Sequence, residues 1–183
     1  RSPYLLQYGA GVERQLQKSL ALSLNYTGMT GVKLFRSRDV NAPLPPQYQS
    51  RPNSDISVLR MVESAGRMQS HSLDLGLRGS ITEFFSGTVQ YSLARAYNNT
   101  GGIGWFPSNS YDLSGEWARA SFDARHRFRA LGTFKAGELF ELGTILSLNS
   151  GAPYTITTGR DDNHDGRAAD RPTGVPRNGR QGF

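Results

Sequence analysis

The nine residues His71–Gly79, HSLDLGLRG, decide which fold this chain can adopt. Their apolar and polar residues alternate strictly, with leucine at 73, 75 and 77 and polar residues or glycine at 72, 74, 76 and 78. Successive side chains of a β-strand point to opposite faces, so this pattern predicts a strand with one apolar and one polar face.

The same alternation recurs outward from this stretch. It is clear in 19–28 (SLALSLNYTG) and 84–97 (FFSGTVQYSLARAY), and weaker in 6–14, 125–134 and 140–148. We therefore predict six strands and no helix, an all-β antiparallel fold. Several of the stretches allow the ~9–11 residues that a tilted strand needs to cross a bilayer. Strands of soluble proteins average about half that length.

The predicted connections alternate between short and long. Short ones lie near 15–18, 79–83 and 135–139, whereas long ones cover about 31–67, 98–123 and 151 to the end. Short periplasmic turns and long extracellular loops are typical of a transmembrane β-barrel. Aromatic residues follow the turns, as in the girdles of such barrels, although strands are rich in aromatics in any case. These residues are Tyr4, Tyr26, Phe84, Phe85, Tyr97, Phe134 and Phe140.

The low hydrophobic content of the chain supports strands that each have only one apolar face. Hydrophobic residues make up 37% of the chain, cysteine is absent, and no apolar run approaches the ~18 residues of a membrane helix. The formal net charge is +6, but the arginines are scattered, so we expect no nucleic-acid partner. Outer-membrane lipid is the expected partner of the apolar face. That face is predicted to carry Leu20, Leu22, Leu24, Leu73, Leu75, Leu77, Val89 and Tyr91.

An alternative remains open from these patterns alone. A secreted β-sandwich, acting as a calcium-dependent binding or adhesion module, would bury the same leucines between two sheets. Arg95 fits neither arrangement simply, because it lies in register with the apolar residues Tyr91 and Leu93. Near a long loop, its side chain can extend to the outer membrane interface.

Several stretches occur together in a characteristic order. They are YTGMTGVKLF (26–35), VNAPLPP (40–46), VESAGRMQSHSLDLGLRG (62–79), YSLARAYNN (91–99), FDARHRFRALGTF (122–134) and NSGAPYTITTGRDDNHDGRAADRPTGVPRN (149–178). The set resembles the β-barrel of TonB-dependent receptors. It is most similar to the group whose long chains begin with a carboxypeptidase-regulatory-like domain.

The resemblance implies a bacterial outer-membrane receptor and transporter with a barrel of about 22 strands and a plug domain in its lumen. It implies uptake of a large ligand, a siderophore, glycan or peptide, driven through TonB. We find no plug and no TonB-contacting segment in residues 1–183. Six strands are also fewer than the ~8 of the smallest closed barrels, so the expectation is a partial barrel.

The acidic stretch TTGRDDNHDGRAADRP (157–172) matches the first half of a calcium loop. Asp161, Asn163 and Asp165 precede Gly166 in the pattern D-x-N-x-D-G, and Asp170 is a fourth candidate ligand. Position twelve is Pro172, so this is not an EF-hand. Alternatively, the Asp and Asn side chains cap turns of their own loop, and neighbouring arginines neutralise them.

The remaining candidates lie in loops and strands. TGGIGW (100–105) predicts a flexible loop tip that exposes Trp105 and Phe106, either to contact a ligand or to pack the loop on its neighbour. No hydrolase elbow or zinc motif is present, and we expect no enzymatic activity. His71 and His126 are expected to be interface or wall residues.

Overall fold

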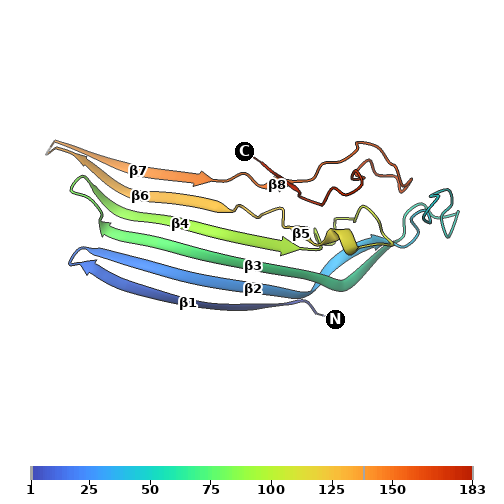
Figure 1. Cartoon of the computed structure of the whole chain (residues 1–183), viewed down its shortest axis with the longest axis horizontal. Helices are drawn as coiled ribbons and strands as arrows, with labels where there is room; N and C mark the ends of the chain where they lie inside the picture. The colour runs from blue at the N-terminus through green and yellow to red at the C-terminus, as the bar shows by residue number, and fades with distance from the viewer. Residues whose placement is uncertain (1, 138, 183) are drawn as a thin grey trace.

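A computed structural model describes residues 2–137 and 139–182. Six long strands form one antiparallel sheet in the order β1-β2-β3-β4-β6-β7, with β5 paired to the end of β4 (Figure 1). The long strands are β1 (Tyr4–Gln17), β2 (Leu20–Asp39), β3 (Arg60–Ser80), β4 (Phe85–Asn98), β6 (His126–Ala136) and β7 (Phe140–Asn149). The short elements are η1 (Ser114–Glu116), β5 (Ala118–Arg119), β8 (Pro153–Tyr154) and β9 (Arg180–Gln181).

The predicted apolar residues share one face of this sheet, which we call the apolar face. Cross-strand pairing aligns them in continuous rows, so the predicted register is confirmed. One row is Leu22, Leu77, Val89, Ala130 and Leu146, and the next is Leu24, Leu75, Tyr91, Phe128 and Leu148.

These apolar side chains are not buried by the protein. Leu73, Leu75 and Tyr91 are each about two-fifths exposed, and β8–β9 is the other sheet in the described part of the chain. A β-sandwich would cover these residues with a second sheet, and no such sheet lies over them here. The buried hydrophobic residues of the described chain are four alanines, Ala42, Ala96, Ala118 and Ala120. The long strands therefore need lipid, rather than a protein core, to cover their apolar face.

Two strands are longer than the sequence predicted. Alternation suggested that β2 ends near residue 28 and that β3 begins near residue 69, but the ladder continues to Asp39 and back from Arg60. The predicted loop 31–67 is therefore wrong and shrinks to 40–59. Ion pairs between β2 and β3 stabilise this extension in place of an apolar face. Glu63 of β3 pairs with Arg36 at 2.6 Å and with Arg38 at 3.2 Å, both on β2.

The predicted alternation of connections is confirmed. Short turns link β1 to β2, β3 to β4, and β6 to β7, whereas residues 40–59, 99–125 and 150–182 form long segments that gather at the opposite end of the sheet (Figure 1). No helix of the described chain is long and apolar enough to cross a membrane. The expectation of no helix is corrected only at η1, which is three residues long.

Arginine substitutions on the two faces of β2 test which face contacts lipid. Leu24 and Asn25 lie at the same depth on β2 but on opposite faces. Leu24→Arg places a charge in lipid and is expected to destabilise the folded state by about 2–4 kcal/mol. Asn25→Arg, which faces Asp74 on the polar side, is expected to cost less than about 1 kcal/mol. Urea unfolding of the full-length protein in lipid vesicles measures both, and equal costs would contradict the assignment of faces.

Candidate functional site

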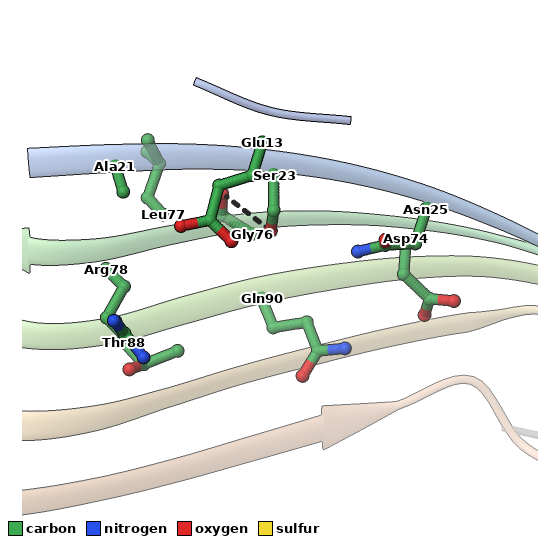
Figure 2. A pocket seen from close by; sticks show the side chains of 10 residues that line it. All are labelled: Glu13, Ala21, Ser23, Asn25, Asp74, Gly76, Leu77, Arg78, Thr88 and Gln90. Carbon is green, nitrogen blue, oxygen red and sulfur yellow. Dashed lines mark hydrogen bonds between the residues drawn. The ribbon is translucent and has the colours of Figure 1, made fainter. Parts of the chain in front are cut away.

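The second face of the sheet is polar and is the first part of the candidate site. We call it the polar face. Figure 2 shows side chains of β1, β2, β3 and β4 that line one shallow hollow on it. Its rows follow directly from strand pairing: Asn25, Asp74, Ser92, Arg127 and Asn149 form one row, and Ser23, Gly76, Gln90, Arg129 and Ser147 form the next.

The polar face carries charges of both signs. Asp74 accepts hydrogen bonds from the hydroxyls of Ser72, at 2.9 Å, and of Ser92 across the β3–β4 pair. A second hollow beside it is lined by Asp74, Arg127 and Arg129. Acidic groups lie on β1 and β3, through Glu13 and Asp74, and basic groups lie on β3 and β6, through Arg78, Arg127 and Arg129. Such a face suits water and polar groups rather than lipid.

The long segments 40–59, 99–125 and 150–182 pack on each other, and we call them the loop cluster. Tyr111 donates its hydroxyl to the carbonyl of Ala42 at 2.7 Å, and Arg51 donates to the carbonyl of Asp165 at 3.0 Å. Asn163 donates its side-chain amide to the carbonyl of Ser108 at 2.7 Å. Each long segment thus contacts both others, although the sequence alone predicts them only as loops.

Part of the loop cluster packs on the polar face at one end of the sheet, whereas its Trp117 stacks on Tyr97 of the opposite face. Asn98 belongs to the same register face of β4 as Gln90 and Ser92, and its side chain accepts a hydrogen bond from the Arg177 guanidinium. The backbone N–H of Ala96 donates to the Asp123 carboxylate at 2.9 Å. Ala96 and Asn98 are consequently buried.

Buried ion pairs hold the loop cluster together. Glu116 is 1% exposed and is bonded by Arg171 at 2.7 Å, and the Arg177 guanidinium lies 3.7 Å from its carboxylate. Burial lowers the pKa of Arg177, and Glu116 opposes that shift. Asp123, also 1% exposed, is bonded by Arg119 at 2.7 Å. Sequence reasoning missed these acids, because a carboxylate in a loop gives no periodic signal.

A third buried acid closes the loop that joins β2 and β3. Asp39 accepts hydrogen bonds from the backbone N–H groups of Asn41, at 3.0 Å, and of Leu59, at 2.9 Å. Arg51 lies 3.4 Å from its second oxygen. The two ends of the loop are therefore tied to one carboxylate.

Trp105 and Phe106 are half-buried, so the expectation that the loop tip exposes both rings is wrong. The Phe106 ring contacts two guanidinium groups, with Arg167 3.8 Å and Arg60 4.5 Å from its centroid. Arg177 lies 5.2 Å from the Trp105 ring. Both rings therefore pack the loop cluster through cation–π contacts. They also line one hollow with Asp165, Asp170 and Arg171, so contact with a ligand stays a prediction.

Hydrogen bonds link the four predicted calcium ligands within one loop. Asp161 accepts from the backbone N–H groups of Asp165 and Gly166, each at 2.9 Å, which curls the chain around its carboxylate. Asp170 accepts from the N–H groups of Asp162 and Asn163. These are the turn caps that the sequence left as an alternative.

Arginine neutralises part of this loop. Arg167 pairs with Asp165 at 2.9 Å, whereas Arg171 is directed to Glu116 instead. Burial raises the pKa of the Asp165 carboxyl, and Arg167 opposes that shift. In the part of the chain that the structure describes, no group of three or more His, Cys, Asp or Glu is arranged to hold a metal ion. Calcium binding by the Asp and Asn oxygens stays a prediction.

Comparison with known proteins agrees with this architecture. A family model described as "Outer membrane beta barrel domain" matches residues 1–182. The chain therefore belongs to the outer membrane β-barrel domain family, and its place is the bacterial outer membrane. Searches of curated proteins and of solved structures each gave no significant match.

The buried ion pairs predict where the loop cluster is most sensitive. Glu116→Ala leaves Arg171 and Arg177 buried without a carboxylate and is expected to cost about 3–5 kcal/mol. Faster hydrogen exchange of residues 99–125 and 150–182, with the strand ladder unchanged, is the expected readout. Arg160→Ala is the control, because Arg160 is 79% exposed where it pairs with Asp162, and it should cost less than about 1 kcal/mol. Equal exchange in the two variants would contradict the role of Glu116.

Proposed function

We propose that this chain forms part of the barrel wall and outer mouth of a TonB-dependent receptor that takes up a large polar ligand. One observation carries the proposal: Arg177 of the loop cluster bonds the side chain of Asn98, which lies on the polar face with Gln90 and Ser92. In a closed barrel the polar face lines the lumen, so the loop cluster lies where a ligand enters.

The chemistry of both regions suits a polar ligand. The loop cluster presents the hollow lined by Trp105, Phe106 and Arg167, which combines ring faces with guanidinium groups. Below it, the polar face offers hydroxyls, amides and charges of both signs, among them Ser92, Gln90 and Arg129. Siderophores, glycans and peptides all carry groups that these side chains can bind.

The proposed uptake predicts a dependence on energy. Cells that lack the full-length protein are complemented with the wild type or with a Trp105→Ala variant, and are given a labelled ferric siderophore, maltooligosaccharide or oligopeptide. We expect uptake of one probe to need both the protein and TonB, and the variant to raise the half-saturating concentration about tenfold. Uptake that persists without TonB would instead indicate a passive pore.

We propose calcium as a second ligand of the loop cluster, at Asp161, Asn163, Asp165 and Asp170. The curl of the chain around the Asp161 carboxylate supports it, and the Arg167 guanidinium, 2.9 Å from Asp165, is the group a cation must displace. Calcium would cross-link the loop 157–172 from within and stiffen it near the mouth.

Calorimetry on the full-length protein tests the calcium proposal. Calcium is expected to release or absorb heat with the wild type, and Asp165→Asn should weaken binding at least tenfold because it removes one anionic ligand. Asp55→Asn, in the exposed part of the loop 40–59, is the control and should bind as the wild type does. No calcium-dependent heat in the wild type would disprove the proposal.

A further inference from the structure

The apolar face changes character abruptly toward the loop cluster. Its rows remain apolar as far as Leu73 and Leu93. The next row on the same face pairs His71 with Arg95, and the one after pairs Gln69 with Tyr97. A lipid-facing arginine at the middle of a bilayer would cost about 2–4 kcal/mol, but close to the interface the cost falls to roughly 0–1 kcal/mol. This boundary is therefore the place to expect the edge of the hydrocarbon region.

The depth of Arg95 agrees with that boundary. Phe85 starts β4 beside a short turn and pairs with Phe134, whose ring also contacts that of Phe84, and an aromatic girdle is expected here. Arg95 lies ten residues further along β4, which is about 33 Å of strand. A strand tilted by roughly 35–45° covers about 25 Å of bilayer over that length, the height of the apolar band of such barrels. Arg95 thus lies at the far edge of the band from the short turns.

Arg95 is a cation without a protein counter-ion. It is exposed, and its guanidinium forms no hydrogen bond or ion pair with any described residue. It lines one hollow with Tyr26, His71 and Arg125, and a second with Tyr97 and Trp117. Neither hollow has an Asp or Glu in its lining. Arg125 is only loosely compensated, with its guanidinium 3.9 Å from Asp123 and its Nε buried without a partner among the described residues.

Aromatic pairs fix the walls on both sides of this cation. Tyr97 and Trp117 stack with ring centroids 6.4 Å apart, and Tyr26 stacks on His71 at 6.1 Å. The Tyr26 hydroxyl is 2.7 Å from the His71 Nδ1, which holds the imidazole in place. Tyrosine and tryptophan prefer the headgroup level of a membrane. The hollow around Arg95 is therefore preformed at the depth of lipid headgroups.

We propose that Arg95, which lies between these aromatic pairs, and Arg125, which lines the hollow beside Tyr26 and His71, bind the phosphate of an outer-leaflet lipid headgroup. The occupant is set by charge and position. A guanidinium that faces outward at the membrane edge meets lipid, and its planar donors match phosphate oxygens in a bidentate pair. The proposal rests on the long loops lying outside the cell, and it is independent of the transported ligand.

The test compares lipids that differ only in phosphate. The full-length protein in detergent is titrated with bisphosphorylated lipid A, with the same lipid after removal of its phosphates, and with inorganic phosphate; thermal unfolding and native mass spectrometry report binding. Bisphosphorylated lipid A is expected to bind at least tenfold more tightly than the dephosphorylated lipid and to raise the melting temperature. Equal binding of the two lipids would overturn the proposal, as would inorganic phosphate that binds as tightly as the phosphorylated lipid.

Variants then assign the site. Arg95→Gln should weaken bisphosphorylated lipid A binding at least fivefold, whereas Arg95→Lys, which keeps the charge but not the bidentate geometry, should fall between it and the wild type. The control is Arg14→Gln, because Arg14 pairs with Leu22 on the apolar face at the short-turn end of the sheet. Wild-type affinity in Arg95→Gln, or an equal loss in Arg14→Gln, would show that Arg95 is not the site. The comparison of lipids on the wild type stands even where a variant fails to fold.

Discussion

Lipid cannot hydrogen-bond a peptide group, and the rest of this structure depends on that constraint. Every N–H and C=O inside the bilayer must be paired, so the chain crosses in long antiparallel strands whose partners supply those bonds. The same constraint removes the need for an apolar interior. Leucine rows on one face meet lipid, and the buried hydrophobic residues of the described chain shrink to four alanines. A protein of 37% hydrophobic residues can therefore fold without a conventional core.

The long segments outside the bilayer are stabilised in a different way. They lie in water and bury few apolar side chains, and buried carboxylates bonded by arginine hold them together. Glu116, Asp123 and Asp39 each tie together segments distant in sequence. A buried charge pair adds little net stability over an apolar contact, but loss of one partner is costly, so it specifies a single arrangement. In this arrangement Trp105 and Phe106 pack the loop cluster against guanidinium groups.

The membrane boundary lies between the apolar strand rows and the loop cluster, and its residues are basic and aromatic. Apolar rows end at Leu93, and Arg95 follows in the same register with no acidic partner among the described residues. Aromatic pairs flank it, where rings find both hydrocarbon and water. The sheet thus has three zones along each strand, for lipid tails, headgroups and water. The third zone includes the charged extension of β2 and β3, which carries the ladder beyond the bilayer to Asp39 and Arg60.

The sequence by itself determined the strands, their two faces and the alternation of short turns with long loops. Strand periodicity is a local property of the sequence. The alternation of apolar and polar residues in HSLDLGLRG therefore indicates the face on which each side chain lies. Tertiary structure alone decided the extension of β2 and β3, the partners of Glu116, and the packing of Phe106 against Arg60 and Arg167. Those contacts join residues tens of positions apart through charge and ring geometry. The sequence around an arginine or glutamate does not show whether its side chain is exposed to water or buried against a partner. Only the folded structure distinguishes these two cases.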